Sequence, residues 1–124
     1  NKHLKPQGIL IFDFWYAAAV MSIKPSVRVK SLSNNDFCIT RIANPEIFEN
    51  LNKVIVKYDF LVEDKNTGKL SKFREEHPMR YFSLPEIEFF ASKAGFKVIN
   101  SEEWLSRAKP SFNSWGVCVV LQKI

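Results

Sequence analysis

The sequence of 124 residues predicts an α/β fold that carries an antiparallel β insertion. An apolar run from Ile9 to Phe14 is typical of a strand buried on both faces of a parallel sheet. Residues 27–82 alternate in the manner of antiparallel strands, and a capped helix followed by two strands occupies residues 83–124. We therefore divide the chain into a strand and helix at 1–24, an antiparallel insertion at 25–82 and a closing segment at 83–124.

The first residues read as the end of a helix rather than as the start of a fold. Lys2 and His3 suit the negative end of a helix dipole, and Pro6 and Gly8 then break the chain. After the apolar strand, an alanine-rich stretch from Tyr16 to Met21 predicts a short helix. We expect the chain to begin in the middle of a fold.

The insertion is predicted to be an antiparallel sheet with one exposed face. A polar turn at 33–36 joins two short alternating strands into a hairpin. A longer strand from Lys53 to Glu63 then turns at 64–68 into a partner that ends near Phe82. One face of the longer strand carries Val54, Val56, Tyr58, Phe60 and Val62.

The closing segment begins with a capping box. Ser83 can accept from the amide three residues on, while Glu86 reaches back to the cap amide, and Pro85 fits the first turn. Gly95 supplies a left-handed stop, and strands are predicted from Phe96 and from Gly116. Helical spacing is shown by the apolar residues Leu84, Ile87, Phe90, Ala91 and Ala94.

Composition excludes several classes of protein. Hydrophobic residues make up 46% of the chain, which excludes a disordered protein. Cys38 and Cys118 lie far apart and only two histidines accompany them, so we expect buried thiols in a reducing cytoplasm and no disulfide or zinc site. The apolar runs are too short to span a bilayer.

The net charge of +5 is spread along the chain and interleaved with acids. This pattern favours a solvated surface over a nucleic-acid groove, with an anionic small substrate as an intermediate alternative. Glycine occurs only at positions 8, 68, 95 and 116, so the sequence holds no glycine-rich phosphate loop. One helix cannot cover two strands that are buried on both faces, so we expect a part to be missing on the amino-terminal side.

Several motifs together resemble class I S-adenosylmethionine-dependent methyltransferases. Leu4 to Gly8 and the strand after it look like that family's turn and fifth strand, although Gln7 stands where the family has glycine; a type I turn would accommodate it. Residues 80–98 are similar to the family's last helix and sixth strand, and residues 115–123 to its antiparallel seventh strand. The resemblance implies a Rossmann-like sheet of which this chain supplies the last three strands and the last helix.

The same resemblance implies a function. The family's cofactor is S-adenosylmethionine, held by a glycine-rich loop and an acidic residue that are both absent here. The insertion is similar to those of sugar N,N-dimethyltransferases and glycine N-methyltransferase-like enzymes. We therefore expect part of an enzyme that methylates a nitrogen or oxygen of a small molecule, inactive in isolation, with no nucleic-acid or membrane partner.

Candidate site residues follow the first strand. Asp13 interrupts the apolar run, so it either contacts substrate or bonds to loop amides as a structural carboxylate. Trp15 and Tyr16 stand at the end of the strand, where one of the two could pack on the substrate or on the cofactor's sulfonium group.

Further candidates lie on the insertion and just after it. His77 is the candidate general base, and the alternative is a histidine that is hydrogen-bonded within the sheet. Arg28 and Arg80, together with Arg41, either hold an anionic substrate or pair with nearby acids. Tyr81 completes the predicted substrate-binding set.

A second hypothesis is a non-catalytic binding or assembly module. The long hairpin from Lys53 to Phe82 would need cover or an edge partner, which favours a homodimer formed through the antiparallel sheet.

Overall fold

The computed structural model describes residues 2–124, which form two compact units. The α/β unit comprises Asn1–Lys24 and Arg80–Ile124, and the insertion unit comprises Pro25–Met79. The strands are hydrogen-bonded in the order β2-β3-β4-β5-β1-β7-β6. The boundary at residue 79 lies inside β5, Leu70–Phe82, because the last residues of that strand pair with β1.

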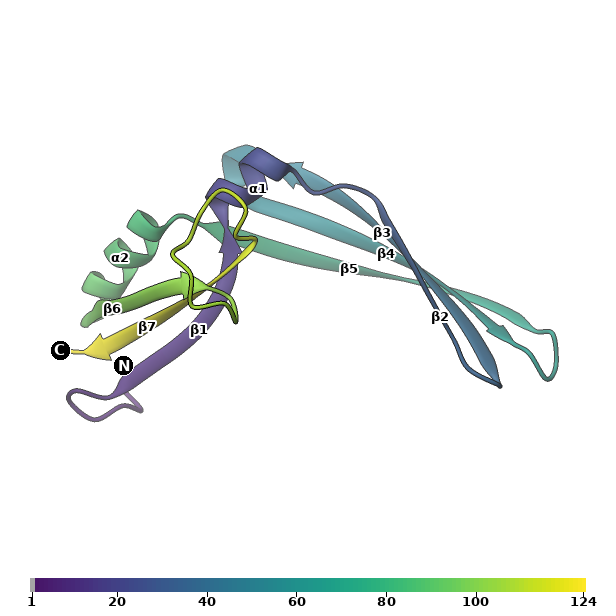
Figure 1. The fold of residues 1–124 in the computed structure, drawn as a ribbon, viewed down its shortest axis with the longest axis horizontal. Coiled ribbons are helices and arrows are strands. Elements are labelled where there is room, and N and C mark those ends of the chain that lie inside the picture. Colours follow the sequence, from purple (N-terminus) through teal and green to yellow (C-terminus); the bar gives the residue numbers. More distant parts are fainter. Residues whose placement is uncertain (1) are drawn as a thin grey trace. The chain divides into compact units, whose positions relative to one another are not determined.

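The α/β unit holds the first strand and helix and the closing segment (Figure 1). β7 runs antiparallel between β1 and β6, while the end of β5 pairs in parallel with the end of β1 through Trp15 and Tyr81. Its elements are β1 (Ile9–Tyr16), α1 (Ala17–Ile23), α2 (Leu84–Lys93), β6 (Phe96–Glu103) and β7 (Gly116–Lys123).

The helix α2 begins and ends as the sequence predicts. The Ser83 hydroxyl accepts from the Glu86 amide at 3.4 Å, and the Ser83 amide donates to the Glu86 carboxylate at 2.9 Å. Gly95 adopts a φ of 77°, the left-handed stop. The helix packs its buried side on one face of the sheet (Figure 1). The resulting core contains Phe14, Ile87, Ala91, Phe96, Val117, Val119 and Leu121.

The expectation that β1 is buried on both faces is wrong for the face that points away from α2. Ile9 is 43% exposed and Ile11 is 61% exposed. Among residues 2–124, β7 pairs with one edge of β1 along Ile9–Trp15, while β5 reaches the other edge only at Trp15 and Tyr16. The apolar residues remain exposed because no described element covers this face of the strand near its start.

The turn before β1 also differs from expectation. Lys2 and His3 form turns rather than the end of a helix, and Asn1 lies outside the described residues. Gln7 has a φ of 64°, which is left-handed and excludes the expected type I turn, whose central residues have negative φ. Glycine is favoured in this region, since a side chain there clashes with its own backbone.

The insertion unit is an antiparallel sheet, as predicted, and it contains no α-helix among its described residues. The turn between β2 and β3 is held by Asn34, whose side-chain oxygen accepts from the Phe37 amide at 2.7 Å. β3 pairs with β4 along its full length. The elements are β2 (Arg28–Ser33), β3 (Phe37–Phe48), the 3₁₀ turn η1 (Glu49–Leu51), β4 (Lys53–Asp64) and most of β5.

The two faces of this sheet differ in chemistry. On one face, which we call the ion-pair face, Lys57 pairs with Glu46 and Arg74 pairs with Asp59, each at 2.9 Å. The opposite face, the aromatic face, carries the side chains of Tyr58, Phe60, Phe73 and His77, which contact one another. The face predicted for Val54 to Val62 is therefore confirmed as the more apolar one.

Within the described part of the chain, neither helix has the length and apolarity needed to cross a membrane.

Candidate functional site

The carboxyl end of β1 gathers three of the residues predicted for the site. Alternation along β1 turns Asp13 and Trp15 away from α2, whereas Phe14 and Tyr16 pack against the core. Tyr81 is aligned with Trp15 across the parallel pair and therefore lies on the same face. Ligands of open α/β sheets bind at the carboxyl ends of the strands, so this face is the candidate site.

An aromatic wall lines this face. The rings of Trp15 and Trp115 meet edge to face at 5.1 Å, and the Tyr16 amide donates to the Trp115 carbonyl at 2.9 Å. Tyr81 is buried, and its hydroxyl donates to the Met21 sulfur at 3.7 Å. Trp115 and Met21 were not predicted for the site. Trp115 could have been found, because it directly precedes a strand that was expected to be antiparallel to β1.

A buried hydrogen-bonded serine holds Trp115 in place. The Ser114 hydroxyl is fully buried and donates to the Glu103 carboxylate at 2.9 Å, while the Ser111 amide donates to the Ser114 hydroxyl at 2.9 Å. Replacing Ser114 would deprive both the Ser111 amide and the Glu103 carboxylate of this partner, which is costly for polar groups held away from water. This network fixes the loop that places Trp115 against Trp15.

Asp13 is exposed, although the apolar run around it predicts a strand that is buried on both faces. It is aligned with Cys118 of β7, and Glu102 of β6 is aligned with the same cysteine. Burial raises the pKa of the Cys118 thiol, and the charges of Glu102 and Asp13 raise it further. The face therefore carries two carboxylates near its aromatic wall.

The remaining predicted residues of the α/β unit lie on the α2 side. Tyr16 packs against the apolar core. The guanidinium of Arg80 lies 4.8 Å from the centre of the Phe82 ring and 3.9 Å from the Glu86 carboxylate. Neither residue shares the face of Trp15.

His77 and Arg28 belong to the insertion unit. His77 is exposed, its Nε2 lies 3.0 Å from the Glu75 carboxylate, and its ring meets the edge of Tyr58 at 5.0 Å. Arg28 is exposed on β2 and is aligned with Ala43. The predicted residues thus fall into groups in separate units, and Tyr58 joins His77 without having been predicted.

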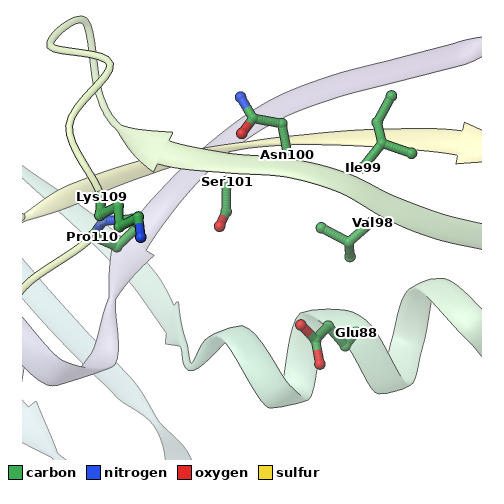
Figure 2. Close-up of a pocket in the computed structure, with 7 residues that line it drawn as sticks. All are labelled: Glu88, Val98, Ile99, Asn100, Ser101, Lys109 and Pro110. Atoms are coloured by element: carbon green, nitrogen blue, oxygen red, sulfur yellow. The ribbon is translucent and has the colours of Figure 1, made fainter.

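The α/β unit also has a shallow hollow of about 490 Å³ between α2, β6 and the loop that follows β6 (Figure 2). None of the residues predicted for the site lines it. Its lining residues are Glu88, Val98, Ile99, Asn100, Ser101, Lys109 and Pro110. We do not include this hollow in the candidate site, because it is open and lies on the α2 side of β6, away from the face that carries Trp15.

No protein-family model matches the chain, and no curated protein sequence matches it. Solved structures do match it in fold. An S-adenosylmethionine-dependent methyltransferase from Clostridium acetobutylicum aligns with a TM-score of 0.77 and 16% identity, covering 98% of this chain and 47% of that one. The amino pentose methyltransferase CalS10 from Micromonospora echinaspora, solved with S-adenosylmethionine bound, aligns at 0.75 and 18% identity, covering 99% and 47%. The sugar N-methyltransferase KedS8 from Streptoalloteichus aligns at 0.73 and 13% identity, covering 98% and 44%.

These matches confirm the predicted fold class. The chain has the fold of the carboxyl-terminal half of S-adenosylmethionine-dependent methyltransferases, with the antiparallel insertion included. It spans about half the length of the structures that it matches.

Proposed function

We propose that this chain is the carboxyl-terminal segment of an S-adenosylmethionine-dependent methyltransferase that acts on a nitrogen or oxygen nucleophile of a small molecule. The observation that carries the proposal is the match of nearly the whole chain, insertion included, to an amino pentose methyltransferase and a sugar N-methyltransferase. The aromatic wall at the carboxyl end of β1 supports it, since ligands of such sheets bind there.

The described residues fit only part of the cofactor. Aromatic rings attract a cationic sulfonium, and Trp15 and Trp115 offer such rings at the end of β1. The chain's glycines lie in a turn before β1, in a hairpin turn, at the end of α2 and at the start of β7, so none lies in a turn that leads from a strand into a helix. We therefore propose that the rest of the cofactor is bound by a segment outside this chain.

The bound cofactor would supply an electrophilic methyl group on sulfur. The residues of this chain would then position the acceptor and exclude water, which are the main contributions a protein makes to an in-line transfer. Asp13 would hold a protonated amine near the wall. His77 stays the proposed general base, and within the insertion unit its Nε2 lies 3.0 Å from the Glu75 carboxylate. Tyr81, which is buried and aligned with Trp15, would support this wall rather than contact the acceptor, and Arg80 lies on the α2 side instead.

Calorimetry tests whether the chain lacks the main cofactor site. We expect S-adenosylmethionine titrated into residues 1–124 to give no saturable binding at micromolar concentrations. Tight binding would contradict the proposed incompleteness. A glycine-rich strand-turn-helix encoded upstream of Asn1 would support it.

A transfer assay tests the proposed class. In a longer polypeptide that supplies the cofactor-binding half, Trp15→Ala should reduce transfer of labelled methyl to amino sugars roughly tenfold or more. The matched control is Phe89→Ala, since Phe89 is an exposed aromatic residue of α2, on the side of the same unit that faces away from Trp15. Equal losses in both variants, or transfer to no small-molecule acceptor, would count against the proposal.

One observation favours the assembly module as a second candidate. β2 is an edge strand, and all six of its residues are exposed, so its outer edge can pair with another strand. Sedimentation velocity at several concentrations tests this, and a strict monomer would exclude a homodimer through the insertion.

A further inference from the structure

The aromatic face of the insertion unit holds two rows of side chains that cross four strands. In the first row, Lys30 is aligned with Arg41 and Arg41 with Phe60, and the Phe60 ring stacks on Phe73 at 4.7 Å. In the second row, Arg28, Ala43, Tyr58 and His77 follow one another in the same way. The first row therefore has cations on both β2 and β3, and the second row has a cation on β2. In both rows the residues on β4 and β5 carry rings.

The lysine and arginines of these rows have no acidic partner in the part of the chain that the structure describes. Among residues 2–124, no carboxylate lies within ion-pair distance of Arg28, Lys30 or Arg41. Lys30 and Arg41 are directly opposite each other on antiparallel strands, an arrangement that is destabilising for like charges. The opposite face of the same sheet neutralises Lys57 and Arg74 with carboxylates. Among the described residues of the aromatic face, the lack of neutralisation is thus confined to the cations of β2 and β3, because His77 on β5 lies 3.0 Å from the Glu75 carboxylate.

The rings next to these cations form a flat apolar shelf. Phe60 and Phe73 are nearly parallel, with an interplanar angle of 11°, and Phe73 is 47% exposed. The Arg41 guanidinium lies 5.1 Å from the centre of the Tyr58 ring, so the cationic and aromatic parts of the surface are in contact. Neighbouring strands are about 4.8 Å apart, so a row of four residues spans roughly 14 Å.

We propose that this surface binds a small oxyanion carried on an aromatic ring. The oxyanion group, a phosphate or a carboxylate, lies between Arg28, Lys30 and Arg41, where charged N–H donors bind it and relieve the repulsion between Lys30 and Arg41. The ring lies on the shelf of Phe60 and Phe73. A small molecule fits this surface, because the cations occupy three neighbouring positions and the adjoining positions on β4 and β5 carry rings. The inference uses the insertion unit alone and does not depend on methyl transfer.

The test uses the chain of residues 1–124 and defined probes. Phenyl phosphate, benzoate, inorganic phosphate and phenol are titrated while amide shifts are followed by NMR. We expect phenyl phosphate to bind more tightly than phosphate or phenol and to shift amides of β2, β3 and β5. Comparison with benzoate then shows whether the oxyanion is a phosphate or a carboxylate.

Paired variants separate a site from general electrostatic attraction. Lys30→Gln with Arg41→Gln should weaken phenyl phosphate at least tenfold, since each removes a charged donor. The control, Lys57→Gln with Lys72→Gln, removes the same charge from β4 and β5 at positions that alternate away from the aromatic face, and should change affinity less than twofold. Phe73→Ala should abolish the advantage of phenyl phosphate over phosphate.

Three outcomes would overturn the proposal. Equal weakening in the two double variants would show attraction by net charge alone. Equal affinity for phenyl phosphate and phosphate would exclude the shelf. Absence of binding by any probe, together with self-association that Phe73→Ala removes, would show that a second copy of the chain covers this face instead.

Discussion

The α/β unit and the insertion unit are built from the same chain but are stabilised differently. In the α/β unit, α2 covers one sheet face, and the core between them includes the largely inaccessible Phe96, Val119 and Leu121. In the insertion unit, the buried apolar residues are confined to Ala43, Val54 and Val56, and cross-strand rings and ion pairs supply the remaining contacts. Apolar burial is worth roughly 25 cal/mol per Å², whereas exposed ion pairs contribute little, so a similar substitution should have unequal effects in the two units.

The largest difference is expected for leucine truncation. Leu121 is 4% exposed and Leu70 is 66% exposed. Leu121→Ala should lower the free energy of unfolding by about 2–5 kcal/mol, because it removes buried contacts and leaves a cavity. Leu70→Ala should change it by less than about 0.5 kcal/mol. Urea denaturation followed by circular dichroism measures both, and similar effects would show that the units share one mode of stabilisation.

Backbone strain gives a second, smaller difference. Gln7→Gly should stabilise the α/β unit by roughly 1 kcal/mol, because glycine adopts the φ of 64° without a steric penalty. Asn52 of the insertion unit has a φ of 49°, yet Asn52→Gly should gain less, since asparagine tolerates this conformation.

The neighbouring residue provides the control of opposite sign. A Cβ at Gly8 would lie 2.8 Å from the Lys5 carbonyl oxygen, so Gly8→Ala should destabilise the chain. Thermal unfolding measures all three variants. A stabilising Gly8→Ala would mean that the turn before β1 is not close-packed as described.

The two units also differ in the expected reactivity of their cysteines. Cys38 of the insertion unit is partly exposed, whereas Cys118 is buried, and burial together with Glu102 and Asp13 raises the pKa of its thiol. Because the thiolate is the reactive form, iodoacetamide at neutral pH should modify Cys38 at least tenfold faster than Cys118. Mass spectrometry of peptides follows the two rates, with the Cys38→Ser variant to isolate the slower site. Equal rates would show that the wall side of β7 opens readily.

The smallest effect is expected from an exposed ion pair of the insertion unit. The hydrogen bond from Arg74 holds the pKa of Asp59 below its ordinary value of 3.8. This stabilisation is present above pH 3.8 and is lost as the pH falls through the lowered pKa. Arg74→Gln should therefore reduce stability slightly at neutral pH and flatten its decline below that value. Acid titration of unfolding tests this, and an unchanged acid limb would mean that the pair contributes nothing.

Local patterns in the sequence were sufficient to predict most elements. The Ser83 and Glu86 capping box, the Gly95 stop and the alternating face of β4 depend on neighbouring residues alone, and each was predicted correctly. The exposure of Ile9 and Ile11 was not predicted, because an apolar run shows that a strand can be buried without showing whether anything covers it.

The site could be predicted only in part. Asp13 and Trp15 were found because they interrupt or end an apolar strand. Trp115 and Tyr58 were missed, because their roles depend on cross-strand register between residues that are distant in sequence. Gln7 was misjudged for another reason, since the left-handed turn is fixed by the surrounding chain and not by the preference of glutamine.

The exposed edge of β1 has a consequence for the handling of this protein. From Ile9 to Phe14 the strand offers backbone donors and acceptors along one side, and its exposed isoleucines lie beside them. Such an edge is a template for aggregation, because an added strand satisfies the backbone groups and buries the apolar side chains at the same time. The yield of unaggregated protein should therefore fall with concentration. Ile11→Lys should restore it, because a charged side chain at this edge opposes the addition of another strand.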